Sequence, residues 1–124
     1  PIVITIGLIN MANNIRDRVK DQASGRKTLP ILLGKRASIT FMAVMYIIAY
    51  VFVVYTALFV DGGSLFYLLV LLSFPMPVKA FRRFKKNDTP ASMMPAMAAT
   101  GKTNTIFGVL YALGIYISAL LGGI

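Results

Sequence analysis

The sequence predicts an all-α protein, a bundle of helices that crosses a membrane several times. Of its 124 residues, 57% are hydrophobic and only 14% are charged, whereas a soluble domain typically has about 25% charged residues. A globule of this size has too little interior to hide so much apolar surface from water. In addition, residues 39–60 form an uncharged run of 22 residues, which is long enough to cross a bilayer as a helix.

Four membrane segments are expected along the chain, at about residues 1–20, 39–60, 64–81 and 104–123. The first is apolar only over its initial 12 residues, and Pro1 is an unusual first residue. We therefore expect the chain to be the C-terminal portion of a longer protein whose N-terminal half is missing. After the second segment, two glycines follow Asp61 and predict a tight turn, with Ser64 placed to cap the next helix.

The third segment has only 14 apolar residues, 65–78, and ends near Pro75 and Pro77, so its length alone also allows a re-entrant segment. The distribution of charge favours a full crossing. All 13 basic residues lie in two blocks, 16–36 and 79–102. Because basic loops stay on the cytoplasmic side of a membrane, both blocks are expected there, with a crossing segment that extends to about residue 81 and is kinked by its prolines.

Two cytoplasmic connections, about 21–38 and 82–103, are expected to join these segments. In the second, Thr89 and Pro90 predict a helix start, and Gly101 predicts the end of a short helix. This helix would lie against the cytoplasmic face of the bundle or at the bilayer interface. The final segment carries a stripe of mostly small side chains that predicts close helix packing: Gly108, Ala112, Ile115 and Ala119.

Composition also excludes several function classes. The chain has no Cys and no His, which excludes disulfides, thiolate chemistry, zinc sites and histidine acid–base catalysis. The net charge of +9 is a feature of nucleic-acid binders, but such proteins carry their basic face on a water-soluble core. The expected partner is therefore the lipid bilayer rather than nucleic acid.

Two carboxylates lie one helical turn apart inside the first basic block. If the first segment stays helical to about Ser24, where Gly25 ends it, five oxygen-bearing side chains share an arc of about 100°: Asn10, Asn13, Asn14, Asp17 and Asp21. Arg16, Arg18 and Lys20 are then expected to point away from this acidic stripe. Mg²⁺ prefers oxygen ligands and uses only one or two protein carboxylates beside water and phosphate. The pattern predicts either a metal site at Asp17, Asp21 and Asn14 or an ordinary solvated charge pattern.

Cationic side chains around the acidic pair are candidates to bind a phosphorylated ligand: Arg16, Arg26, Lys27 and Lys35. Thr28 and Gly34 bound a short predicted helix whose start would add backbone N–H donors. On the second membrane segment, Tyr46 and Tyr50 share one face. They either pack against neighbouring helices or line a substrate cavity, together with Asn10 and Asn13, for an apolar or cationic species.

The stretch NNIRDRVKDQASGRKTLPILLGKR, residues 13–36, resembles the second aspartate-rich motif of the UbiA superfamily of intramembrane prenyltransferases. The doubled Asn and the Arg-Asp pair resemble the 1,4-dihydroxy-2-naphthoate polyprenyltransferase branch. Residues 75–115 are similar to the C-terminal region of that branch. The resemblance implies a UbiA-like bundle of nine membrane helices, of which this chain supplies four as the C-terminal part of one domain, residues 1–124.

The resemblance also implies a reaction. A polyprenyl group passes from polyprenyl diphosphate to 1,4-dihydroxy-2-naphthoate, with loss of CO₂ and diphosphate, to give demethylmenaquinone in the bacterial plasma membrane. Two aspartate-rich motifs hold Mg²⁺ on the diphosphate, and Asp17 and Asp21 correspond to the catalytic pair of the second. The chain lacks the first motif, so we expect it to be inactive alone. The alternatives are a transporter or channel fragment with an Asn/Asp pathway, a structural membrane subunit, or a UbiA-type enzyme for another aromatic acceptor.

Overall fold

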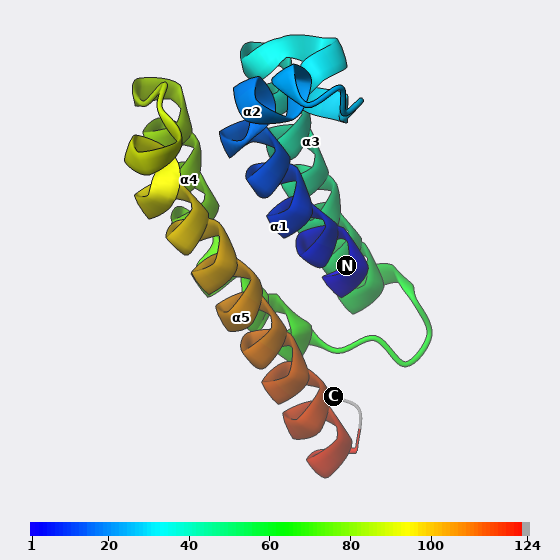
Figure 1. The fold of residues 1–124 in the computed structure, drawn as a ribbon. Coiled ribbons are helices and arrows are strands. Elements are labelled where there is room, and N and C mark those ends of the chain that lie inside the picture. Colours follow the sequence, from blue (N-terminus) through cyan, green and yellow to red (C-terminus); the bar gives the residue numbers. More distant parts are fainter. Residues whose placement is uncertain (123–124) are drawn as a thin grey trace.

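A computed structural model describes residues 1–122, and all regular structure in that range is helical (Figure 1). The elements are α1 (Ile2–Arg16), α2 (Arg18–Ala23), α3 (Leu29–Phe59), the 3₁₀ helix η1 (Leu65–Ser73), α4 (Pro75–Lys86) and α5 (Pro90–Leu120). Helix α1 packs against α3 and α5, while η1 and α4 pack against both α3 and α5. The predicted all-α bundle is confirmed.

Three helical stretches are long and apolar enough to cross a membrane, namely 29–59, 65–86 and 90–120. The first expected segment corresponds to α1, which is apolar but shorter. The third segment is continuous through η1 and α4, as expected for a crossing segment, and its helix type changes at Phe74 and Pro75. In Figure 1, α2, the start of α3 and the turn between α4 and α5 lie at one end of the bundle, and the turn after α3 lies at the other. We call the former the basic end.

The predicted short helix ending at Gly101 is wrong. Helix α5 begins at Pro90 behind the Thr89 cap, as expected, but runs through Gly101 without a break to Leu120. A glycine in a helix interior costs about 1 kcal/mol relative to alanine. Buried contacts on both sides offset this cost, because Ala96, Thr100 and Thr103 are fully buried. Helix α5 therefore includes much of the expected connection 82–103.

The small-residue stripe on α5, expected to pack closely, makes no close helix contact within residues 1–122. Ala112, Ile115 and Ala119 are exposed, and a Cβ on Gly108 would meet no heavy atom within 4 Å. The packed face instead carries Phe107, Gly114 and Ser118. A Cβ on Gly114 would lie 2.4 Å from the Phe66 carbonyl oxygen, so the close approach is between α5 and η1.

Candidate functional site

The acidic stripe forms on a nearly continuous helix made of α1 and α2. The Asp17 N–H donates to the Asn13 carbonyl at 2.9 Å, and the Asp21 N–H donates to the Asp17 carbonyl at 2.8 Å. Helical bonding thus continues across Asp17, although its backbone (φ −92°, ψ 6°) separates the two helices. Gly25 then adopts φ +77°, a left-handed conformation in which glycine has no steric penalty. The predicted helix end at Ser24 and Gly25 is confirmed.

The Asp17 carboxylate lies beside the guanidinium group of Arg16. Arg16 donates from Nε to Oδ1 at 2.8 Å and from Nη2 to Oδ2 at 2.6 Å, a bidentate ion pair. Its third nitrogen, Nη1, lies 3.6 Å from the Met94 sulfur on α5. The expectation that Arg16 points away from the acidic stripe is therefore wrong. Its Cα–Cβ bond starts away from the stripe, but the side chain turns back because it gains two charge-assisted hydrogen bonds to Asp17.

Asp21 is the more enclosed carboxylate, with only 7% of the residue exposed. Its Oδ1 lies 3.4 Å from Arg26 Nη1, and its backbone carbonyl accepts from both Ser24 Oγ and the Arg26 N–H. These two hydrogen bonds hold the turn after α2 against Asp21. They keep Arg26 near the Asp21 carboxylate. Burial of an anion is costly unless a partner offsets it, and the Arg26 guanidinium is that partner for Asp21.

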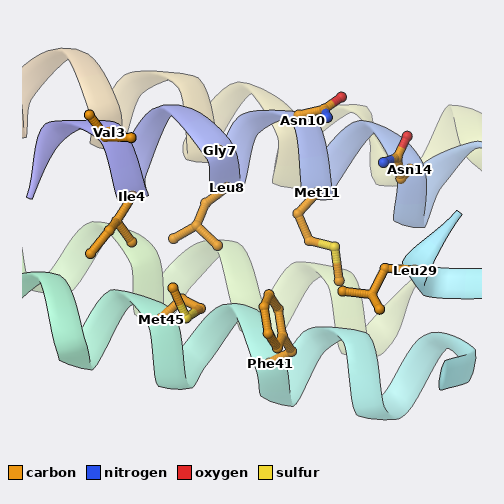
Figure 2. Close-up of a pocket in the computed structure, with 10 residues that line it drawn as sticks. All are labelled: Val3, Ile4, Gly7, Leu8, Asn10, Met11, Asn14, Leu29, Phe41 and Met45. Atoms are coloured by element: carbon orange, nitrogen blue, oxygen red, sulfur yellow. The ribbon is translucent and has the colours of Figure 1, made fainter.

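A cavity of about 390 Å³ lies between α1 and α3, beside this stripe (Figure 2). Its walls are mainly apolar, with Leu8 and Met11 facing Phe41 and Met45 across the gap. Asn10 and Asn14 also line it, and in Figure 2 both project on the side of α1 that faces away from α3. The space between α1 and α3 is therefore mainly apolar, and the Asn10 and Asn14 amides lie at its edge on α1.

The structure does not bring the other predicted cavity residues to this place. Asn13 is half-buried and is not among the residues that line the cavity. Tyr46 and Tyr50 are buried in the core, where their rings make edge contacts with Phe81 and Phe107, respectively. This geometry supports the packing interpretation of the tyrosine face.

The two tyrosines differ in one respect that gives a testable prediction. The Tyr50 hydroxyl lies 2.7 Å from Ser73 Oγ, whereas the buried Tyr46 hydroxyl has no hydrogen-bond partner among residues 1–122. Tyr50→Phe is expected to lower the free energy of unfolding by about 1 kcal/mol, because it leaves Ser73 with one partner fewer. Tyr46→Phe should be neutral or stabilising. The comparison is made by thermal unfolding in detergent, and equal losses in both variants would contradict it.

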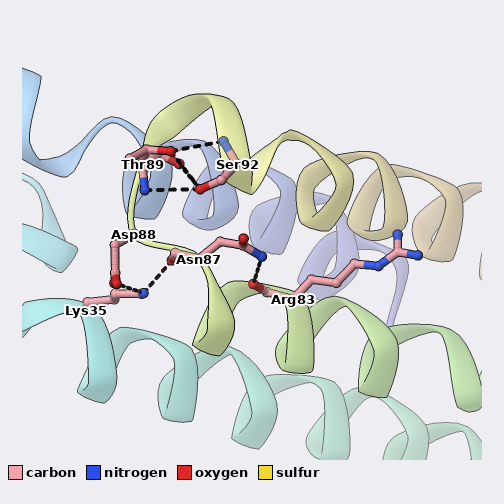
Figure 3. A network of polar contacts seen from close by, with 6 residues as sticks. All are labelled: Lys35, Arg83, Asn87, Asp88, Thr89 and Ser92. Atoms are coloured by element: carbon pink, nitrogen blue, oxygen red, sulfur yellow. Dashed lines mark hydrogen bonds and ion pairs between the residues drawn. The ribbon is translucent and has the colours of Figure 1, made fainter.

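The predicted phosphate-binding cations are divided between two places. Arg16 and Arg26 lie beside the carboxylates, and Lys27 follows in the exposed turn. Lys35 instead donates to the Asn87 carbonyl and to Asp88, in the polar network that also contains the Thr89–Ser92 cap (Figure 3). The sequence contained one signal for this pairing, since Asp88 is the lone acidic residue in the second basic block.

The short helix expected after Gly25 is present as the first turns of α3. It begins after Thr28, with Pro30 in its first turn, and ends at Gly34, where φ is +79°. Within the described residues the Thr28 hydroxyl oxygen is buried and has no hydrogen-bond partner, so Thr28 is the N-cap by position only.

Asp17 and Asp21 therefore lie one turn apart where α1 passes into α2, each with an arginine beside it. The family model described as the UbiA prenyltransferase family matches residues 1–106 of the chain. The chain belongs to the UbiA prenyltransferase family. This match confirms the fold expected from the motif at residues 13–36, and the membrane character expected from composition. No solved structure matches the chain.

Three relatives show how far this similarity extends. The chain is 44% identical to the 1,4-dihydroxy-2-naphthoate octaprenyltransferase of Bacillus subtilis over 95% of its length, and 31% identical to the Escherichia coli protein of the same name over 86%. It is 33% identical to the UbiA prenyltransferase domain-containing protein 1 homolog of Drosophila melanogaster over 90%. These alignments cover 38%, 34% and 29% of the relatives, respectively, so the chain spans less than two fifths of each.

The residues fit a hard cation by their chemistry. Among residues 1–122 no group of three or more acidic, His or Cys side chains comes together, so a cation here would have at most two carboxylate ligands from this part of the chain. Such a site suits Mg²⁺, which takes one or two protein carboxylates and completes its shell with water and phosphate oxygens. In the structure each carboxylate is paired with an arginine, Asp17 with Arg16 and Asp21 with Arg26, so a metal ion would have to compete with these guanidinium groups.

Proposed function

We propose that the full-length protein transfers a polyprenyl group from polyprenyl diphosphate to 1,4-dihydroxy-2-naphthoate, with loss of diphosphate and CO₂. The product would be demethylmenaquinone, in a bacterial plasma membrane with the basic loops on the cytoplasmic side. The main support is the 44% identity to the Bacillus subtilis protein of that name over 95% of the chain. The paired carboxylates on α1 and α2 are the chemical feature that this reaction requires.

In this proposal Asp17 and Asp21, with the Asn14 amide beside them, would hold the metal. When bound, Mg²⁺ supplies positive charge that stabilises the departing diphosphate. Arg16 and Arg26 pair with these carboxylates in the structure, and they would turn to the phosphate oxygens when the donor binds. Lys27 and Lys35 would add charge at longer range. Arginine suits direct contact with phosphate because its planar guanidinium group can donate two hydrogen bonds to one phosphate.

The cavity in Figure 2 would take the apolar part of the donor near its diphosphate. Its walls are apolar side chains from α1 and α3, and such a lining excludes water from the allylic carbon that ionises. Asn10 and Asn13 would lie near the polar end of the donor. Tyr46 and Tyr50 do not line this cavity and are buried in the core, so in this proposal they support the bundle and are not assigned to the allylic cation.

The acceptor is tested by supplying 1,4-dihydroxy-2-naphthoate and 4-hydroxybenzoate separately to the full-length protein with a labelled prenyl diphosphate. We expect a labelled product and CO₂ release with the naphthoate. A product with the benzoate alone would assign the protein to another aromatic acceptor. Transport of ions across reconstituted vesicles with no covalent product would support the channel alternative. Residues 1–124 alone are expected to give no product.

A further inference from the structure

A second cavity, outside the aspartate site, lies at the basic end between α3 and α4. It has a volume of about 390 Å³ and is lined by Lys35, Arg36 and Ile39 of α3 and by Lys85 of α4. Lys35 is paired with Asp88 (Figure 3). Neither Arg36 nor Lys85 has an ion-pair partner within residues 1–122. The cavity therefore presents two uncompensated positive charges.

A separate apolar groove lies between α3 and η1, farther along α3 from the basic end. Its volume is about 330 Å³, and its lining comes from α3 and η1: Ile47, Tyr50, Val51, Val54, Leu71 and Phe74. Arg36 and Ile47 are eleven residues apart, as are Ile39 and Tyr50. Eleven residues make about three helical turns, so these positions share one side of α3 and are separated by about 16 Å along it.

The wall formed by η1 and α4 also changes from cationic to apolar with distance from the basic end. Lys85 lies near the end of α4 and Phe74 lies eleven residues before it, where η1 passes into α4. The seam between α3 and the η1–α4 segment is thus cationic at the basic end and apolar toward the middle of the bundle. Large apolar side chains beside it on α3, including Val44, Ile47 and Val51, are exposed.

We propose that this seam binds an anionic phospholipid of the bilayer leaflet at the basic end. Its phosphate would lie between Arg36 and Lys85, and one acyl chain would follow the groove. Basic pockets between membrane helices are suited to acidic headgroups, and the positions of charge and apolar surface match the depths of headgroup and chain. The lining of the cavity contains no carboxylate among the described residues, which distinguishes it from the metal and diphosphate site proposed at Asp17 and Asp21.

The test measures retention of labelled phosphatidylglycerol and of phosphatidylcholine by the full-length protein in detergent. We expect the wild-type protein to prefer phosphatidylglycerol. Arg36→Gln and Lys85→Gln should each lower its affinity about fivefold, and the double variant about 25-fold, since a basic residue near an anionic surface contributes about 1 kcal/mol. Lys86→Gln is the matched control, because Lys86 is exposed on the same helix and does not line the cavity.

A second pair of variants tests the groove. Val54→Trp should fill it and lower retention, whereas Val109→Trp, at an exposed position of α5 that does not line the groove, should not. Asp17→Asn should leave retention unchanged, so the outcome is independent of the proposed reaction.

Four results would overturn the proposal. The first is equal retention of both lipids, as expected if another part of the protein covers the seam. The second is an equal loss in Lys86→Gln. The third is displacement of phosphatidylglycerol by inorganic phosphate alone, which would indicate a simple anion site. The fourth is competitive displacement by farnesyl diphosphate in the presence of EDTA, which would assign the seam to the prenyl donor.

Discussion

Asp17→Asn and Asp21→Asn, made separately in the full-length protein, are each expected to lower Mg²⁺-dependent prenyl transfer on the order of 10²–10³-fold. Each change keeps the shape of the side chain but removes a negative charge that would hold the metal on the diphosphate. The larger effect is expected at Asp21. It is the more buried of the two carboxylates, and its only ion pair within the described residues is the 3.4 Å contact with Arg26.

The measurement is turnover of a labelled prenyl diphosphate over a series of Mg²⁺ concentrations, with membrane insertion checked in parallel. Asp61→Asn is the matched control, because Asp61 is an exposed aspartate in the turn at the other end of the bundle. It should leave turnover unchanged. Near-normal turnover in both the Asp17 and Asp21 variants would remove the basis for a metal site on this helix.

Gly114→Ala is expected to lower the free energy of unfolding by about 1–3 kcal/mol, the range found when a packed site is overfilled. The added methyl would lie 2.4 Å from the Phe66 carbonyl oxygen, 2.9 Å from its carbon and 3.2 Å from the Tyr67 Cα. All three neighbours are backbone atoms, so no side chain can rotate to relieve the clash. Helix α5 and η1 would have to separate.

The matched control is Gly108→Ala, in the same helix. No heavy atom lies within 4 Å of the Cβ it would add, and alanine is a better helix former than glycine, so no loss of stability is expected. The two variants are compared by thermal unfolding in detergent. A loss in Gly108→Ala with none in Gly114→Ala would show that the other face of α5 is the packed one.

Much of the fold followed from local features of the sequence. The uncharged runs fixed where the chain can cross a bilayer, and the positions of the two basic blocks indicated that the third segment crosses. Gly25, Gly34 and the Thr89–Pro90 start marked helix boundaries correctly. The acidic stripe was also predictable, because residues one turn apart on a helix share a face whatever surrounds them.

Only the tertiary structure decided which helix faces meet and which charges pair. Nearly every face of a membrane helix is apolar, so hydrophobic periodicity does not separate a face that packs on protein from one that contacts lipid. The sequence therefore favoured the Gly108 stripe, whereas η1 packs on Gly114. The sequence pattern likewise predicted a helix end at Gly101. In the structure, burial against neighbouring helices keeps α5 continuous there. The pairing of Lys35 with Asp88 joins residues 53 positions apart, and such distant contacts are set by packing rather than by local pattern.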